Sequence, residues 1–444
     1  MKFKPYPKYK PTGVEWVGDI PEHWEVKRLK AVVTQVDRKV ETKEDLKLRF
    51  IGMEDVEPWV GRLLENTTET VPMGMANAFK KGNILFGKLR PYLAKACIAE
   101  SDGLCSTEFL VLESSALNKR FLLYTLLTEG MVKLIDSSTY GTKMPRASWD
   151  FIGNRPVLIP SCEEQEAIVR FLDERTKKVD VLIKRKQALI ERLKEKRSAL
   201  ISHTVTKGLP PQAARSAGLP VNPKMKPSGV EWLGDVPEQW EIRRIKDIGS
   251  IRYGLGEPPE YVDDGLPFVR ATDIKRGKIC LDDVKKIRPE DVLWSRGPLL
   301  ILDEILVVRS GAYTGDSAII SKGVAGSIAG YDMVLTARKS VPAFVAWALL
   351  SRYFLEGQIY LERMRAAQPH LNAEQLGGFV ILGPQQDEQE TIVDFLNAET
   401  EKLDSVNEKV ERAIERLKQY RSALITATVT GKINIREIEE NKLP

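Results

Sequence analysis

Apolar residues recur at alternating steps of four and three in two long stretches, one starting near Ile168 and the other near Ile392. A repeat of 3.5 residues sustained over about four heptads is typical of a coiled-coil seam. Neither stretch contains Pro or Gly, so we predict two helices of about 33 residues, each roughly 50 Å long, that pair in antiparallel fashion. The alternative is that each amphipathic helix packs only on its own domain. The positions assigned to the helix pair are Ile168, Leu172, Val179, Leu182, Leu189, Leu193, Leu200, Ile392, Leu396, Leu403, Val406, Val410, Leu417 and Leu424.

Outside these stretches the pattern changes to short apolar runs bounded by Gly, Pro and Asp, which predict strands. Ile84–Leu89 parallels Ile305–Ser310, so an equivalent buried strand is expected in each half. The longer apolar runs 121–135 and 344–359 predict helices. Each half is therefore predicted to be a mixed α/β domain of the α+β class.

The two halves arise from an internal duplication. GVEWVGDIPEHWEVKRLK, starting at Gly13, returns as GVEWLGDVPEQWEIRRIK, starting at Gly229, and the segment from Glu163 returns from Asp387. A repeat unit this long indicates two whole domains rather than a solenoid. We therefore expect two similar domains separated by two long helices, with pseudo-twofold symmetry. The predicted divisions are a first globular domain at 1–160, a central helix at 161–207, a Pro-rich linker at 208–228, a second globular domain at 229–384, a distal helix at 385–432 and a tail at 433–444.

The composition is ordinary for a soluble globular protein, with 43% hydrophobic and 29% charged residues. The formal net charge of +5 is compatible with a polyanionic partner without demanding one. The four cysteines show no CxxC spacing and there are only three histidines, so no disulfide framework and no metal site are expected. No stretch approaches the roughly 20 apolar residues of a membrane span, and a cytoplasmic location is expected.

The search for catalytic motifs yields no complete one. Gly82–Lys88 has the spacing GxxxxGK of a phosphate-binding loop, but Leu89 stands where a Ser or Thr would hold magnesium. Its intervening residues look like a strand. We therefore predict no catalytic residue, no metal and no cofactor in this chain.

Basic, aromatic and amide side chains gather in loops at matching places in the two halves. Arginine and lysine suit guanine edges and phosphates, and amide side chains suit adenine. The alternative for each residue is an ordinary solvated loop side chain. The candidate DNA contacts are Lys88, Arg90, Tyr92, Lys143, Arg146, Arg270, Arg309, Ser310, Tyr313, Gln368, His370 and Asn372.

The two long helices differ in charge. Arg175–Arg197 holds ten Lys or Arg against three Asp or Glu, whereas Glu399–Arg421 holds six of each. The basic stretch is either a solvated helix face or a surface for a polyanion or an acidic partner.

The repeated GVEW motif, the run KLRPYL to STEFLVL at Lys88–Leu112 and the segments EEQEAIVRFLDERT and RSALI resemble the specificity subunits of type I restriction-modification systems. The resemblance covers nearly the whole chain. It supports assigning Lys88–Tyr92 and Ser106–Phe109 to a recognition domain. The second domain lacks KLRPYL and STEF, so its sequence preference is expected to differ.

The resemblance implies a non-catalytic subunit whose two domains each read one half of a split double-stranded DNA target. It also implies that the helices space the domains and dock two modification (methyltransferase) subunits, with restriction subunits outside. S-adenosylmethionine, ATP and magnesium would then belong to those partners.

Two other classes of function stay open from the sequence. A methyltransferase or nuclease complete in one chain would need a cofactor-binding glycine motif and a catalytic tetrapeptide. A structural adaptor would use its globular ends to bind proteins. A steep salt dependence of DNA affinity separates the DNA reader from the adaptor, because phosphate contacts release counterions.

Overall fold

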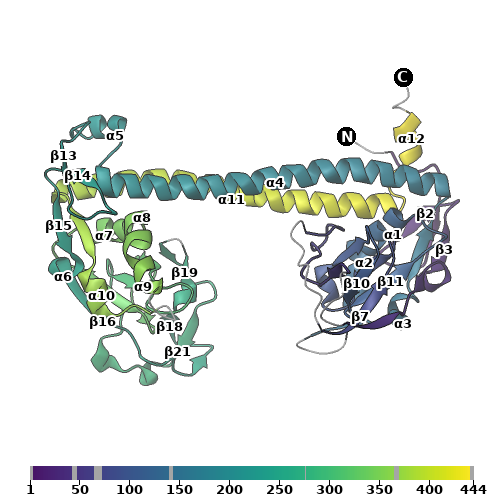
Figure 1. Cartoon of the computed structure of the whole chain (residues 1–444), viewed down its shortest axis with the longest axis horizontal. Coiled ribbons are helices and arrows are strands. Elements are labelled where there is room, and N and C mark those ends of the chain that lie inside the picture. Colours follow the sequence, from purple (N-terminus) through teal and green to yellow (C-terminus); the bar gives the residue numbers. More distant parts are fainter. Residues whose placement is uncertain are drawn as a thin grey trace. The chain divides into compact units, whose positions relative to one another are not determined.

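The structure is a computed structural model that describes residues 4–42, 48–64, 73–139, 144–275, 277–364 and 370–440 (Figure 1). The chain forms two compact units. Unit 1 comprises Met1–Gln187 and Arg412–Pro444, and unit 2 comprises Ala188–Glu411. Helices α4 (Cys162–Lys207) and α11 (Gln386–Val429) each contribute one part to unit 1 and the other part to unit 2.

In the described residues, the part of unit 1 that precedes α4 contains two four-stranded sheets and three short α-helices. The first sheet has the order β5-β7-β10-β6, in which only β10 and β6 are parallel, and the second has the antiparallel order β4-β11-β8-β9. Two ribbons, β1-β2 and β3-β12, complete the strands. The strands are β1 Tyr9–Pro11, β2 Asp19–Pro21, β3 Glu25–Arg28, β4 Thr34–Gln35, β5 Lys39–Thr42, β6 Phe50–Ile51, β7 Gly74–Phe79, β8 Ile84–Gly87, β9 Ala96–Ile98, β10 Gly103–Ser106, β11 Phe109–Glu113 and β12 Pro156–Ile159. The helices are α1 Lys119–Leu126, α2 Glu129–Asp136 and α3 Trp149–Ile152.

Unit 2 repeats the antiparallel sheet, with the order β16-β25-β22-β23. Its mixed sheet has the order β17-β21-β18-β24, with β18 and β24 parallel, so the earlier strand of the parallel pair is central here and the later one is central in unit 1. The remaining strands pair as β13-β14, β15-β26 and β19-β20. The strands are β13 Met225–Pro227, β14 Asp235–Pro237, β15 Glu241–Arg244, β16 Gly249–Tyr253, β17 Tyr261–Val262, β18 Leu266–Val269, β19 Ile274–Lys275, β20 Lys278–Ile279, β21 Lys285–Ile287, β22 Ile305–Val307, β23 Ser317–Ile319, β24 Ile328–Ala329, β25 Met333–Ala337 and β26 Val380–Gly383. The helices are α5 Pro211–Ser216, α6 Ile245–Ile248, α7 Pro342–Leu349, α8 Arg352–Phe354, α9 Tyr360–Met364 and α10 Ala373–Gly378.

The central strands β8 and β22 are buried on both faces. In β8, Ile84 and Phe86 belong to the core shared with α1, α2 and the long helices, while Leu85 belongs to a second core shared with the other sheet. In β22, Ile305 and Leu306 divide in the same way. Because successive side chains of a strand point to opposite faces, a strand buried on both sides needs a continuous apolar run. The expected pair of equivalent buried strands is confirmed.

The tryptophan of each GVEW motif packs against a glycine in the same globular part. A Cβ added to Gly130 would lie 2.3 Å from the Trp16 ring, and a Cβ added to Gly357 would lie 2.7 Å from the Trp232 ring. Only glycine therefore lets the indole rest on the backbone there. The same packing thus occurs in both units, at tryptophans that occupy the same place in the two copies of the motif.

The expected single helices at 121–135 and 344–359 are wrong in detail. The first is broken into α1 and α2, which are separated by Leu127 and Thr128. The second is broken into α7 and α8, followed by a π-helical turn at Leu355–Ile359. The glycines that make room for the two indoles lie just after these breaks. Amphipathic periodicity alone does not detect such interruptions.

The segments expected to be a linker and a tail both contain ordered elements. The linker region 208–228 holds α5 and β13, and β13 pairs with β14 as β1 pairs with β2. In the tail region, Ile433 and Ile435 belong to the unit 1 core, and the Asn434 amide donates to the Lys4 carbonyl at 3.0 Å. Helix α12 (Ile435–Glu440) follows.

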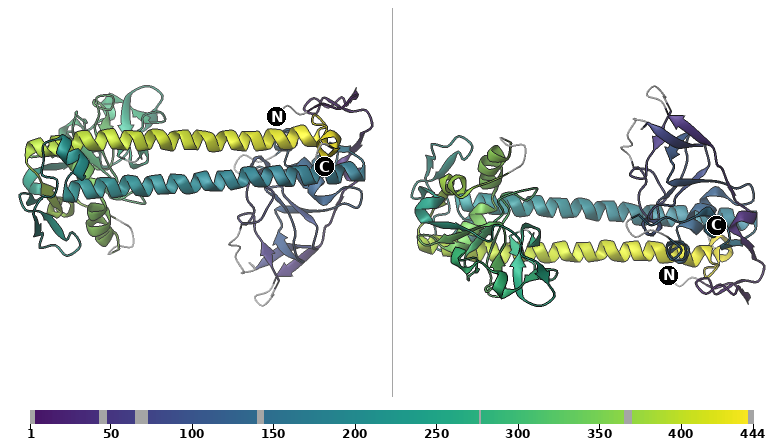
Figure 2. Two further views of the ribbon diagram at one scale, coloured as in Figure 1. Left: turned by 90° about the horizontal axis from the view of Figure 1, so that it is seen from above. Right: turned by 90° about the horizontal axis from the view of Figure 1, so that it is seen from below.

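The two long helices pair in antiparallel fashion, which confirms the expected coiled coil (Figure 2). In unit 1, Arg421 of α11 contacts Asp180 of α4, and in unit 2, Arg197 of α4 contacts Asp404 of α11. From Asp180 to Arg197, α4 advances by as many residues as α11 goes back from Arg421 to Asp404. The two ion pairs therefore fit one antiparallel register. The helices have 46 and 44 residues, more than the expected 33 or so, because their ends continue into the domain cores.

At every second position the seam of the helix pair lies one residue later than predicted. Buried or half-buried positions run along α4 at 172, 176, 179, 183, 186, 190, 193, 197, 200 and 204, and along α11 at 396, 400, 403, 407, 410, 414, 417, 421, 424 and 428. Leu172, Val179, Leu193, Leu200, Leu396, Leu403, Val410, Leu417 and Leu424 of the predicted set belong to this seam. Leu182, Leu189 and Val406 are 44%, 42% and 42% exposed and each directly precedes a seam position. Ile168 and Ile392 are buried in the cores of units 1 and 2, respectively.

Candidate DNA interface

The first candidate loop follows β8 in unit 1. The Lys88 amide donates to the Glu108 carbonyl at 2.9 Å, and the Arg90 amide donates to the Pro145 carbonyl at 2.8 Å. Arg90 has a left-handed backbone, with φ of 50°, and its side chain and that of Tyr92 are exposed. The structure therefore brings the 88–92 loop and the 145–146 segment together.

Within this loop region Arg146 already has a partner. Its Nη2 lies 2.9 Å from Oε1 of Glu108 and its Nε lies 3.0 Å from Oε2, a bidentate pair. A paired guanidinium holds the two loops in place, so a contact from Arg146 to a base would compete with Glu108. The cationic groups of Lys88 and Arg90 lie in the same loop region.

The second candidate loop follows β22 in unit 2 and centres on Arg309. Its guanidinium carbon lies 4.7 Å from the Tyr253 ring centre and 4.3 Å from the Tyr331 ring centre, which are cation–π distances. Its Nη2 lies 3.0 Å from Nε2 of His370, and Ser310 and His370 form a β-bridge. The structure thus brings together Arg309, Ser310 and His370, although His370 is far from the other two in the sequence.

Sequence reasoning missed the two tyrosines and Asp332. The Arg309 amide donates to Oδ1 of Asp332 at 3.2 Å, and burial of this carboxyl raises its pKa to about 6. The Nε of Arg309 is buried and has no hydrogen-bond partner among the described residues. The two rings and His370 hold the guanidinium in one orientation.

The other candidates are placed differently. Tyr313 is 49% exposed on the turn after Arg309. Arg270 forms a bidentate pair with Asp273, with Nη2 and Oδ1 2.9 Å apart. Asn372 caps helix α10, where its side chain accepts from the Gln375 amide at 2.8 Å. Lys143 and Gln368 lie outside the described residues.

The described residues contain no group of three or more His, Cys, Asp and Glu side chains that could hold a metal ion. Gly82–Lys88, which has the spacing of a phosphate loop, consists mainly of the buried strand β8. In the part of the chain that the structure describes, no helix is long and apolar enough to cross a membrane.

The repeated architecture defines a class of protein: two similar α+β domains that share an antiparallel helix pair. The family model for the type I restriction modification DNA specificity domain matches residues 21–192 and again 237–416. The chain belongs to this family.

Two relatives share most of their length with this chain. The type I restriction enzyme MjaVIII specificity subunit of Methanocaldococcus jannaschii is 23% identical over 440 residues, which cover 94% of this chain and 95% of the relative. The EcoBI specificity subunit of Escherichia coli is 23% identical over 331 residues, which cover 73% of this chain and 68% of the relative.

A solved structure shares the fold. It is described as the structural basis of complex assembly and conformational transition of the type I R-M system. Its matching chain has a TM-score of 0.67 and 16% identity, covering 93% of this chain and 99% of that chain.

Proposed function

We propose that this chain is the non-catalytic DNA specificity subunit of a type I restriction-modification complex, and that each globular domain reads one half of a bipartite double-stranded DNA target. The observation that carries the proposal is the duplicated loop after the central strand. In each unit this loop presents cationic and aromatic side chains at an equivalent place, after β8 and after β22.

The chemistry of the two loops supports two different half-sites. The unit 1 loop offers Lys88, Arg90 and Tyr92, whereas the unit 2 loop offers Arg309 held between Tyr253 and Tyr331. Arginine and lysine can contact guanine edges in the major groove, and both can also bind phosphate. A shared scaffold with different loop residues is what two readers of different sequences need.

The helix pair serves, in this proposal, as spacer and docking surface for two methyltransferase subunits, with restriction subunits added in the complete cytoplasmic complex. Exposed apolar side chains support a docking role: Val181 and Leu182 on α4 in unit 1, and Leu189 on α4 and Val406 on α11 in unit 2. Contiguous exposed apolar patches, rather than single residues, mark protein interfaces, so the adjacent Val181 and Leu182 give the main support. S-adenosylmethionine, ATP and magnesium are supplied with those partners.

The test is methylation of a random DNA library by the chain combined with its methyltransferase subunits. A bipartite sequence with a fixed spacer is expected. Replacing residues 31–160 by the corresponding domain of another family member should change one half-site and leave the other unchanged. If both half-sites changed, or if methylation showed no sequence preference, the proposal would be wrong.

A further inference from the structure

In unit 1 a carboxylate on one long helix joins the other helix and the globular domain. Asp180 of α4 lies 3.0 Å from Nε of Arg421 on α11, and its other oxygen lies 3.8 Å from Nη1 of Arg62. Arg421 also donates from Nη1 to the Trp59 carbonyl at 2.9 Å and from Nη2 to the Val60 carbonyl at 3.0 Å. Arg421 therefore binds both Asp180 and the 59–62 loop of the domain.

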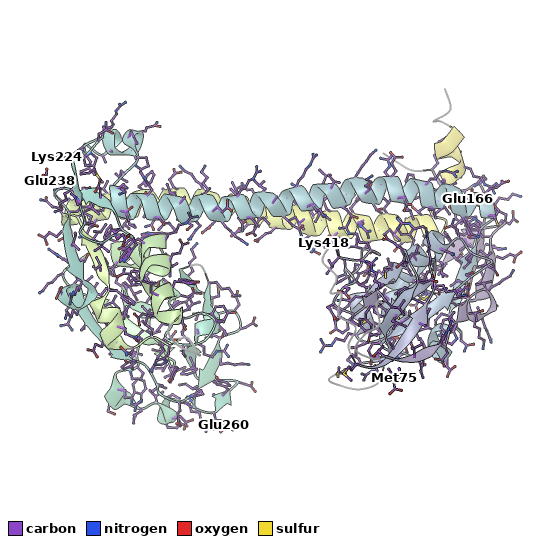
Figure 3. The ribbon with its side chains drawn as sticks, in the orientation of Figure 1. Met75, Glu166, Lys224, Glu238, Glu260 and Lys418 are labelled. Carbon is purple, nitrogen blue, oxygen red and sulfur yellow. The ribbon has the colours of Figure 1, made fainter. Side chains whose placement is uncertain are left out.

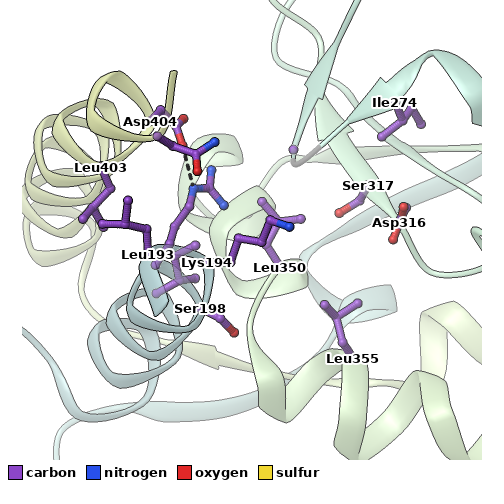
Figure 4. A pocket seen from close by; sticks show the side chains of 14 residues that line it. Leu193, Lys194, Ser198, Ile274, Asp316, Ser317, Leu350, Leu355, Leu403 and Asp404 are labelled. Atoms are coloured by element: carbon purple, nitrogen blue, oxygen red, sulfur yellow. Dashed lines mark ion pairs between the residues drawn. The ribbon is translucent and has the colours of Figure 1, made fainter. Parts of the chain in front are cut away.

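Unit 2 contains the equivalent junction. Asp404 of α11 lies 3.3 Å from Nε of Arg197 on α4, the ion pair that Figure 4 marks with a dashed line at Asp404. The other oxygen of Asp404 lies 3.3 Å from Nζ of Lys278. Lys278 belongs to the β19-β20 ribbon of the globular domain. A helix carboxylate again connects the second helix with a domain loop.

The duplication relates the ion pairs of these two junctions residue by residue. In the register that aligns the two long helices, Asp180 corresponds to Asp404 and Arg197 corresponds to Arg421. Each aspartate therefore pairs with the arginine of the other copy. This exchange is what an antiparallel pair of equivalent helices requires.

The basic loop residues are related in the same way. In the register that aligns the two GVEW motifs, Arg62 corresponds to Lys278, and each follows a glycine with a left-handed backbone, with φ of 85° and 82°. Both halves thus keep one Asp–Arg pair and one basic loop residue, although the surrounding loop sequences differ.

The charged pairs lie beside incomplete packing. In unit 1 the 57–64 loop and the helices border a pocket of about 1450 Å³, and in unit 2 the ribbon and the helices border one of about 330 Å³. The side chains of Arg421 and Asp180 are only 8% and 15% exposed, while Arg62 and Lys278 are 42% and 69% exposed. The Asp–Arg pairs are largely shielded from solvent between the two helices, and the more exposed Arg62 and Lys278 connect them with the domains.

We propose that Asp180 and Asp404 are positioning residues that hold each recognition domain in one orientation on its section of the helix pair, and thereby restrict the spacer length that the complex accepts. The effect on spacer preference rests on the proposed function, whereas the effect on the orientation of the domain can be measured without it. Neither aspartate needs to touch DNA.

The structural test uses the isolated full-length chain with spin labels at Met75→Cys and Lys418→Cys, both exposed residues of unit 1 (Figure 3). Cys162 and Cys280 are replaced by Ser, since both have some exposure. The unaltered junction should give one narrow distance distribution by electron–electron double resonance. Asp180→Asn and Arg421→Gln should broaden it, and Asp394→Asn, an exposed carboxylate on α11, is the matched control.

The functional test measures methylation on DNA with spacers one or two base pairs shorter and longer than the preferred one. Because a misplacement of about 1 Å can cost about 100-fold in rate, the parent complex should discriminate by about 100-fold per base pair. Asp180→Asn should reduce this to within about tenfold, with the half-site sequences unchanged. Asp404→Asn should act in the same direction.

The outcomes separate this proposal from the proposed function. A folded Asp180→Asn chain with a narrow distance distribution and an unchanged spacer preference would overturn it. So would a uniform loss of methylation at every spacer with a narrow distribution. If Asp180→Asn fails to fold, Arg62→Gln removes the exposed partner of Asp180 together with its 2.6 Å pair to Glu57, and Glu57→Gln is the control for that pair. Arg62→Gln should broaden the distribution and Glu57→Gln should not, and an unchanged distribution in Arg62→Gln would count against the proposal. A parent complex without sequence preference would overturn the proposed function, and the distance measurement would still decide this proposal.

Discussion

The indole Nε1 of Trp24 donates a hydrogen bond of 3.0 Å to Oε2 of Glu164, in the first turn of α4. Trp240 donates to Glu388 at the same distance in the other unit. The repeated motif EHWE or EQWE therefore connects each domain to the start of its own long helix. We expect Trp24→Phe to lower the free energy of unfolding by about 1–3 kcal/mol, because a buried carboxylate loses a donor.

Urea unfolding followed by far-UV circular dichroism measures this effect. The matched change Trp240→Phe should cost less, since Glu388 is more exposed than Glu164. If the parent chain and Trp24→Phe had the same free energy of unfolding, the hydrogen bond would make no net contribution to stability.

Arg309 and Lys88 are expected to act on different halves of the target. If each reaches a base edge, alanine should cost about 1–3 kcal/mol at one base position and relax specificity there. Arg309→Ala should affect only the half-site of unit 2, and Lys88→Ala only that of unit 1. Binding to a panel of single-base variants checks this. A loss that is equal for all sequences would assign the residue to phosphate.

The raised pKa of Asp332 predicts a local pH dependence. The carboxyl has a pKa of about 6 in the folded chain, above its ordinary value of about 3.9, so the folded state binds a proton that the unfolded state has lost. Stability is therefore expected to fall as the pH rises between these values, by roughly 1.4 kcal/mol per pH unit for this group. Asp332→Asn should remove this slope, which thermal unfolding from pH 4 to 8 measures. A slope that persists in the variant belongs to other groups.

Helix length is expected to set the spacer between half-sites. Inserting one heptad after Gln187 and one after Glu411 keeps both heptad repeats and their pairing in register, and adds about 10 Å to each helix. At about 3.4 Å per base pair, the preferred spacer should lengthen by about three base pairs. Methylation on a spacer series measures it, and insertion into α4 alone is the control, which should mismatch the seams. An unchanged spacer would mean that the helices only connect the domains.

The apolar pattern predicted the helix pair but placed part of its seam one position too early. At 182, 189 and 406 the sequence offers Leu or Val, whereas the seam at the following positions contains Ile183, Ile190 and Asn407. Apolar residues at both adjacent positions of α4 make the two registers hard to distinguish. Polar seam residues such as Arg197 and Arg421 make the true register still harder to predict, because the ion pairs that stabilise them form only when both helices are present.

The candidate DNA loops were predictable as loops, but their internal partners were not. Lys88 and Arg309 follow buried strands that the sequence indicates clearly. Tyr253 and Tyr331, however, come to Arg309 from strand β16 and the turn before β25. Such contacts depend on strand order in a sheet, and local periodicity does not determine that order.

The burial of Ile433 and Ile435 in the core of unit 1 has a consequence for the order of events during synthesis. Unit 2 is a continuous stretch, Ala188–Glu411, whereas unit 1 needs residues from Arg412 onward to complete its core. Domains usually fold in the order in which they leave the ribosome. Here we expect the reverse: the half that is made first must wait for the last part of the chain. A ribosome-bound chain stalled when residues up to 411 have just left the exit tunnel should therefore contain a protease-resistant second half and a first half that is still cleaved.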